Sequence, residues 1–134
     1  MTLSPNTWYQ KYPFCGGKNQ SPININEFKT VYDKSLMPIY FDTNFVPNKP
    51  NTIWTRKNTG HTIVYALNNE TVYTIFNEGN FSLVQMHFHW GHSEHQINGI
   101  FYFAELHLVH RSVVDPSKLA VLGFLFQVIK IYFV

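Results

Sequence analysis

Two strand-like segments of this chain bring three histidines, His87, His89 and His107, into a stretch of 21 residues. Side chains on a β-strand alternate between the two faces of a sheet, so His87 and His89 share a face. His107 lies in the second segment, where Glu105 and Val109 share its face. If the two segments pair as antiparallel neighbours, the three rings can converge on one point. The pattern therefore favours a β-sheet whose adjacent strands build a common site.

Three neutral imidazoles that leave one coordination position open form the ligand set of a catalytic zinc site. Gln85 precedes His87 by two residues, and Glu105 precedes His107 by two. Each can accept a hydrogen bond from the ring nitrogen that its histidine does not offer to the metal, and such partners fix the tautomer of a ligand. A single histidine is more often structural, so the prediction of zinc rests on the three together.

The turn between the two segments raises a question of register. Asn-Gly at residues 98–99 is the strongest two-residue hairpin signal in the chain. In a regular ladder running back from that turn, His107 would lie on the opposite face from His89, because a one-residue slip exchanges the faces. We therefore expect either a bulge between residues 91 and 93 or a turn of another length.

The remaining sequence indicates a mainly β chain with no amphipathic helical stripe. Aromatic residues make up 17% of the chain and charged residues 13%, which favours sheet and supplies apolar side chains for a core. Residues 1–37 are predicted to be irregular. Alternating patterns predict strands at 37–41, 52–56, 62–67, 71–77, 81–90, 100–111 and 119–128, the last of them buried. Turn residues predict connections at 44–51, 68–70, 77–80 and 115–117.

The chain resembles the α-type carbonic anhydrases through most of its length. The motifs in family order are YPFCGG at 12–17, QSPINI at 20–25, NTGH at 58–61, QMHFHWG at 85–91, SEH at 93–95, AELHLVH at 104–110 and LAVLG at 119–123. The resemblance implies part of that family's fold: a large, twisted, predominantly antiparallel central sheet with irregular N-terminal wrapping. It also implies zinc-dependent, reversible hydration of carbon dioxide to bicarbonate and a proton.

The resemblance assigns further roles, beside the three histidines that match the family's zinc ligands. His61 matches the proton shuttle, and a histidine with a near-neutral pKa suits that role, although a surface histidine after a turn would look the same. Glu94 matches the carboxylate that orients a threonine hydroxyl above the metal. Val109 and Val121 match the walls of the carbon dioxide pocket, and both are equally compatible with an ordinary core.

Family members are much longer than this chain, and 134 residues leave room for one domain. We interpret residues 1–134 as a single truncated carbonic anhydrase domain or an incomplete gene model. The threonine that Glu94 would orient belongs to the missing half, so activity of this chain alone is in doubt. The alternative is a catalytically inactive, zinc-binding remnant of the family. A zinc peptidase is disfavoured, because those usually carry H-E-x-x-H on a helix.

Composition restricts the partners. The formal net charge is +2 and the basic residues are scattered, which argues against nucleic acid or a polybasic membrane segment. The apolar stretch at 119–134 is too short to span a bilayer and contains Gln127 and Lys130. We expect a small-molecule substrate, no transmembrane segment and no obligate protein partner.

The single cysteine, Cys15, cannot form a disulfide within the chain. Its YPFCGG context resembles the extracellular branch of the family, in which this cysteine pairs with one in the second half. That resemblance suggests secretion. Residues 1–5 lack the basic start and apolar core of a signal peptide, so a cytoplasmic location stays open.

Overall fold

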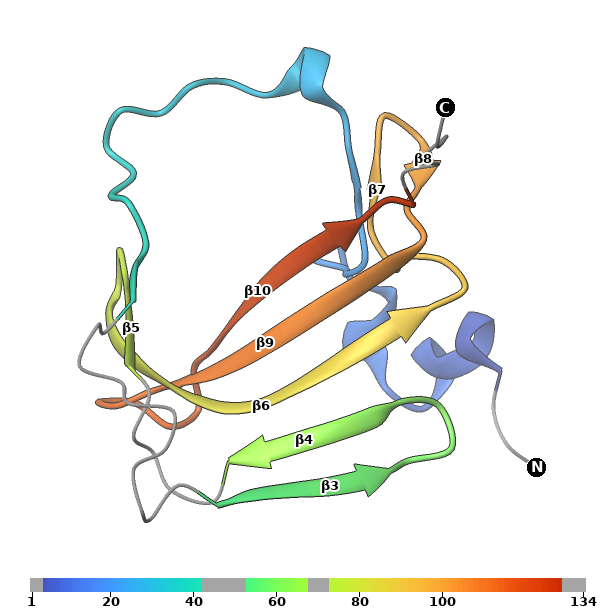
Figure 1. The fold of residues 1–134 in the computed structure, drawn as a ribbon. Helices are drawn as coiled ribbons and strands as arrows, with labels where there is room; N and C mark the ends of the chain where they lie inside the picture. Colours follow the sequence, from blue (N-terminus) through green and yellow to red (C-terminus); the bar gives the residue numbers. More distant parts are fainter. Residues whose placement is uncertain (1–3, 42–52, 68–72, 129–134) are drawn as a thin grey trace, which may run out of the picture.

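The structure is a computed structural model that describes residues 4–41, 53–67 and 73–128. Its main element is a seven-stranded antiparallel sheet in which β10, β9, β6, β4 and β3 lie in that order, with β5 on β6 and β2 on β5 (Figure 1). A three-stranded sheet joins β1 to the hairpin β7–β8. The elements are η1 (Pro5–Gln10), η2 (Pro13–Gly16), β1 (Asn24–Ile25), η3 (Glu27–Lys29), β2 (Tyr40–Phe41), β3 (Trp54–Asn58), β4 (Ile63–Leu67), β5 (Tyr73–Phe76), β6 (Gly79–Trp90), β7 (Gln96–Ile97), β8 (Ile100–Phe101), β9 (Ala104–Ser112) and β10 (Leu119–Phe126).

The mainly β, predominantly antiparallel fold expected from the sequence is confirmed, as is the irregular N-terminal region with its short 3₁₀ helices. The predicted connections at 44–51 and 68–70 lie outside the described residues. No helix within the described ranges is long and apolar enough to cross a bilayer.

Two strand predictions need correction. The strand predicted at 100–111 is divided into β8 and β9, because the hairpin tip and the long ladder have different registers. The strand predicted to be buried at 119–128 is β10, where Val121 is 50% exposed and Phe124 41%. β10 is an edge strand with β9 as its one neighbour among the described strands, and an edge strand buries less surface than a central one.

The central strand β6 pairs with three strands of the large sheet, β5, β4 and β9. Its first residues pair with β5 and its later residues with β4, while β9 follows it on the other side with a register shift between Leu83 and Gln85. Phe81 and Leu83 are the buried apolar side chains of the described residues. Phe76 packs edge-on against Phe81 at 5.2 Å and against His110 at 5.4 Å between ring centroids. This small core lies at the start of β6 and the end of β9.

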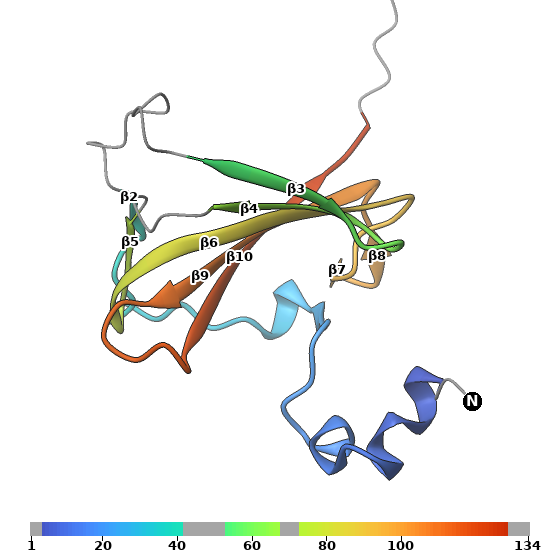
Figure 2. The same ribbon diagram turned by 90° about the horizontal axis from the view of Figure 1, so that it is seen from below.

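The N-terminal segment crosses one face of the sheet and is held by the hairpin tip. Figure 2 shows this segment, in blue, on one side of the sheet. β1 pairs in parallel with β7, and the backbone N–H of Gly99 donates to Asn24 Oδ1 at 2.8 Å. The backbone N–H of Glu27 donates to Asn98 Oδ1 at 3.0 Å, and Asn98 Nδ2 donates to Glu27 Oε2 at 2.6 Å. These contacts bring residues 20–25 over the large sheet.

The register question is settled by an irregular segment between the hairpin tip and the long ladder. Ile97 pairs with Ile100, and both turn residues have positive φ, 52° at Asn98 and 80° at Gly99, so the expected two-residue turn is present. In the long ladder Trp90 pairs with Ala104. Between these two pairings, the five residues 91–95 lie opposite the two residues 102–103, so the first side has three more residues than the second. The expected irregularity is present, and it extends beyond residues 91–93.

Candidate metal centre

The three histidines predicted to bind zinc lie together in the structure. His87 and His89 come from β6, and His107 lies directly opposite His87 on β9. Their ring centroids are 5.1 Å apart for His87–His89, 5.1 Å for His87–His107 and 4.8 Å for His89–His107. One nitrogen of each ring lies within 4.8 Å of the others, which is close enough for one metal ion.

Hydrogen bonds to two of the rings determine which nitrogen remains free. The His87 Nδ1 atom lies 2.8 Å from Gln85 Oε1, and the His107 Nε2 atom lies 2.8 Å from Glu105 Oε1. An amide oxygen and a carboxylate can only accept, so these ring nitrogens carry the protons. His87 Nε2 and His107 Nδ1 are left with free lone pairs, as metal ligands require.

The third ring leaves a buried nitrogen without a hydrogen bond. His89 Nε2 has no hydrogen-bond partner among the described residues, and it lies 3.4 Å from Glu94 Oε2. Buried polar atoms are nearly always paired, so an orphan at this position fits a nitrogen that binds a metal. The donor set fits zinc, which accepts three imidazoles and a fourth, open position.

The charge state of His87 also suits a ligand. Burial lowers the pKa of His87, and positive charge on His107 and His89 would lower it further, while Glu94 acts in the opposite direction. The ring is therefore neutral at pH 7, which is the form that binds metal ions.

Glu105 is the most strongly held group of the site and is only 1% exposed. Its Oε1 accepts from His107 Nε2 at 2.8 Å and from His95 Nδ1 at 2.7 Å. Its Oε2 accepts from the backbone N–H groups of Glu94 and His95, both at 2.9 Å. Burial by itself raises the pKa of Glu105, but these hydrogen bonds outweigh it and hold the pKa at about 2. Glu105 is therefore a carboxylate at any physiological pH.

Sequence reasoning missed the role of His95 and Ser21. Nε2 of His95 lies 3.1 Å from Ser21 Oγ, so a chain of polar contacts runs from Ser21 through His95 and Glu105 to His107. No residue spacing could have indicated this chain. His95 belongs to the irregular segment at 91–95, and Ser21 comes from the N-terminal segment, 74 residues away.

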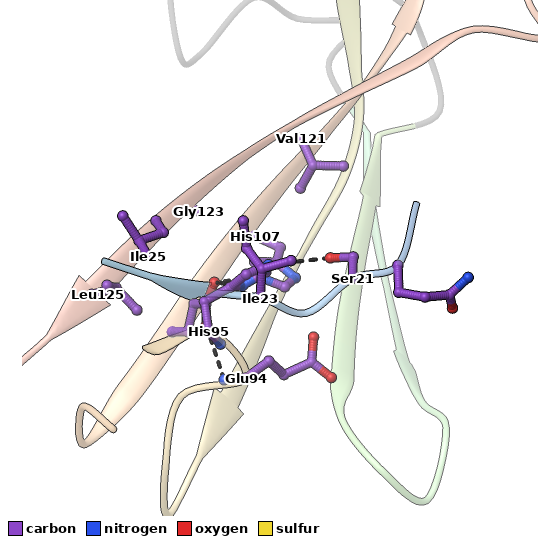
Figure 3. Close-up of a pocket in the computed structure, with 11 residues that line it drawn as sticks. Ser21, Ile23, Ile25, Glu94, His95, His107, Val121, Gly123 and Leu125 are labelled. Carbon is purple, nitrogen blue, oxygen red and sulfur yellow. Dashed lines mark hydrogen bonds and ion pairs between the residues drawn. The ribbon is translucent and has the colours of Figure 1, made fainter. Parts of the chain in front are cut away.

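A pocket of about 620 Å³ adjoins this network (Figure 3). It lies between the N-terminal segment and the sheet. His95, Glu105 and His107 are among its polar lining residues, and Ile23, Val121 and Leu125 among its apolar ones. Val109, the other predicted pocket residue, pairs with Val121 across β9 and β10 but does not line this pocket.

His61 lies in the turn between β3 and β4, where Gly60 has a φ of +87°. The Thr62 hydroxyl donates to the Phe88 carbonyl at 2.5 Å, which connects this turn to the part of β6 that carries His87 and His89. His61 is exposed, and it belongs to neither candidate metal cluster that the described residues form. Its role as proton shuttle stays a prediction.

Comparisons with known proteins identify the family. The family model of the eukaryotic-type carbonic anhydrases matches residues 3–132. The chain is 32% identical over 143 residues to carbonic anhydrase 1 of Mus musculus, covering 92% of this chain and 53% of the relative. It is 37% identical over 112 residues to carbonic anhydrase 12 of Homo sapiens, covering 78% of this chain and 30% of the relative. The chain belongs to the eukaryotic-type carbonic anhydrase family.

The solved structures agree. An α-carbonic anhydrase from Thermovibrio ammonificans, in complex with the inhibitor sulfanilamide, superposes with a TM-score of 0.77 at 35% identity. The superposition covers 94% of this chain and 53% of that protein. The chain thus spans about half the length of this neighbour and of the mouse relative.

Proposed function

We propose that this chain carries the zinc centre of a carbonic anhydrase and takes part in the reversible hydration of carbon dioxide. The observation that carries the proposal is the convergence of three imidazoles whose free nitrogens lie within 4.8 Å of one another. When bound, zinc supplies a water acidic enough to yield hydroxide near neutral pH, an effect for which carbonic anhydrase is itself the reference example.

The protein groups would divide the remaining work. His87, His89 and His107 hold the metal, and Gln85 and Glu105 keep two of those rings in the correct tautomer. Carbon dioxide is uncharged and apolar, so it needs a pocket wall such as the one that includes Val121 rather than a charged anchor.

Two further groups would take part, Glu94 as an orienting carboxylate and His61 as the carrier of the released proton. Glu94, whose side chain is 41% exposed at the pocket edge, is the acceptor that orients a hydroxyl above the metal in the family pattern. His61 would pass the released proton to buffer, because a histidine can both accept and donate near neutral pH.

Because the chain spans only about half of its relatives, we propose that it hydrates carbon dioxide more slowly by itself than a complete family member. A misplacement of about 1 Å in a reacting group can cost on the order of a hundredfold. The exposed edge strand β10, three of whose residues line the pocket, supports this expectation.

Zinc binding and hydration can be tested separately. Zinc is titrated into the purified chain against a chromophoric chelator, with a triple variant, His87→Ala, His89→Ala and His107→Ala, alongside. His92→Ala is the matched control, because His92 is an exposed histidine of the adjacent loop and belongs to no candidate metal cluster among the described residues. Zinc binding that is kept by His92→Ala and lost by the triple variant is the expected result. Equal binding by the triple variant would refute the ligand assignment.

Stopped-flow hydration on the folded, zinc-loaded chain then decides the activity. A rate above that of the triple variant supports the enzyme. Zinc binding with no rate above that variant supports the alternative, a zinc-binding member of the family that does not catalyse the reaction.

We also propose the extracellular location suggested by the sequence around Cys15. Cys15 is exposed, and its thiol is free in the structure. Non-reducing electrophoresis of the protein from its natural source tests the proposal. A disulfide-linked Cys15 is expected in an oxidising compartment, whereas a thiol that reacts fully with a maleimide probe would contradict the proposal.

A further inference from the structure

Gly123 occupies the middle of β10, directly opposite His107. Glycine weakens the interior of a strand, and its presence there often marks a place where another group approaches closely. The described glycines with positive φ are Gly60, Gly79, Gly91 and Gly99, and Gly123 is not among them. Its backbone would therefore accept a side chain, so conformational freedom does not explain this glycine.

The space beside Gly123 is taken by a side chain of the metal site. A Cβ atom at this position would lie 3.0 Å from Glu105 Oε1 and 3.8 Å from His107 Cδ2. The residue paired with Glu105 across the ladder is Leu125, so the carboxylate leans along the strands towards Gly123. Gly123, His107 and Leu125 all line the pocket and are labelled in Figure 3.

The Glu105 carboxylate cannot move aside for an added methyl group without weakening its hydrogen bonds. Both of its oxygens accept two hydrogen bonds each, from the rings of His95 and His107 and from two backbone N–H groups. A shift of Oε1 away from the added methyl group would disturb its 2.8 Å bond to His107 Nε2, which is the contact that turns His107 Nδ1 towards the metal.

We propose that Gly123 is a positioning residue for the metal ligand His107. Its missing side chain leaves the space in which Glu105 holds the His107 ring with Nε2 protonated and Nδ1 free. The consequence for zinc rests on the proposed function, whereas the consequence for the His107 ring does not depend on a metal.

The test compares Gly123→Ala with the unchanged chain in two measurements. The first is the tautomer of His107 in the metal-free chain, read at pH 8 from the ring ¹⁵N shifts. The second is zinc affinity from competition with a chromophoric chelator. We expect Gly123→Ala to mix the two tautomers and to lower zinc affinity about tenfold, the lower end of the range for a lost hydrogen-bond partner of a ligand.

Gly16→Ala is the matched control. It adds the same methyl group at a crowded position, where the heavy atoms near the added Cβ belong to Tyr9, at 3.1 and 3.8 Å, and not to Glu105 or His107. It should leave the tautomer and the zinc affinity unchanged.

A second background shows whether Gly123 acts through Glu105. Glu105→Asp shortens the side chain by one methylene and withdraws the carboxylate from Gly123. Adding Gly123→Ala to Glu105→Asp should therefore change neither the His107 tautomer, the zinc affinity nor the folding any further. The proposal is overturned if Gly123→Ala alone leaves the tautomer and the zinc affinity unchanged. It is also overturned if Gly123→Ala changes them as much in the Glu105→Asp background as in the unchanged chain. If Gly123→Ala alone does not fold, recovery of the fold with Glu105→Asp supports the proposal and continued unfolding contradicts it. Failure of the unchanged chain to bind zinc would refute the proposed function, while the tautomer would still decide the role of Gly123.

Discussion

Replacing Glu105 by glutamine should destabilise the fold strongly, although the two side chains have the same shape. Each carboxylate oxygen of Glu105 accepts two hydrogen bonds, and an amide whose NH₂ group faced the backbone N–H groups of Glu94 and His95 would lose two of them. Turned the other way, the NH₂ group would face His95 Nδ1 and His107 Nε2, which could accept only if both rings changed tautomer, and the charge that strengthens all four bonds would be gone. A hydrogen bond to a charged group contributes about 1.5–3 kcal/mol. Loss of two such bonds gives an expected decrease of about 3 kcal/mol or more in the free energy of unfolding.

The pKa of Glu105 leads to a similar magnitude through the same hydrogen bonds. A carboxyl whose pKa is 4.5 in the unfolded chain and about 2 in the folded chain contributes about 3 kcal/mol above pH 4.5. Because the folded pKa is the lower one, this contribution is lost as pH falls from 4.5 towards 2. The difference in the free energy of unfolding between the unchanged chain and Glu105→Gln should therefore be less than half as large at about pH 3 as at pH 7.

Urea unfolding of the metal-free proteins at pH 7 and at pH 3 measures both effects. Glu78→Gln is the matched control, since Glu78 is an exposed carboxylate in the turn before β6, and such changes cost less than about 0.5 kcal/mol. A loss below about 1 kcal/mol for Glu105→Gln at pH 7, or the same loss at both pH values, would show that the four hydrogen bonds do not stabilise the ionised carboxylate.

Four further outcomes are expected. Gln85→Ala should weaken zinc binding by about 10- to 100-fold in a chelator competition, because His87 Nδ1 loses its acceptor. Phe81→Ala should cost about 3–5 kcal/mol in urea unfolding, since Phe81 is only 2% exposed, whereas Phe28→Ala, at a position 93% exposed, should cost less than about 0.5 kcal/mol. Burial lowers the pKa of His110, so unfolding measured against pH should show stability falling below about pH 6.5, and His110→Phe should weaken that dependence. If the chain is active, His61→Ala should lower the hydration rate at low buffer concentration, and added imidazole should restore that rate. A hydration rate of His61→Ala that does not depend on the buffer would exclude His61 as the proton shuttle.

The sequence predicted the parts of this molecule that depend on local periodicity. The alternation of His87 and His89 and the separate strand of His107 predicted the histidine cluster, on the condition that the two strands are neighbours, because a period of two fixes the face of a strand. The Asn-Gly pair predicted the hairpin turn, because both turn residues need positive φ. These features require no knowledge of the rest of the fold.

Features that depend on the order of the strands were not predictable in the same way. An apolar strand such as β10 has the same sequence pattern in the centre of a sheet and at its edge, so its exposure was wrongly predicted. The contact of His95 with Glu105 depends on an irregular segment, and irregular segments have no period. The crowding at Gly123 is visible only once Glu105 is known to lean along the strands.

The convergence of the three histidines depends on a mismatch in register between the hairpin tip and the long ladder. The numbers of paired residues at the hairpin tip sum to 197, as for residues 97 and 100, whereas those in the long ladder from Gln85 to Trp90 sum to 194, as for His87 and His107. Continuing the tip register would place His107 on the opposite face from His89, because only an odd offset exchanges the faces. The three extra residues of segment 91–95 supply that odd offset. The same segment presents the backbone N–H groups of Glu94 and His95 to Glu105. One irregular segment therefore places the three histidines on one face and fixes the carboxylate that orients the His107 ring.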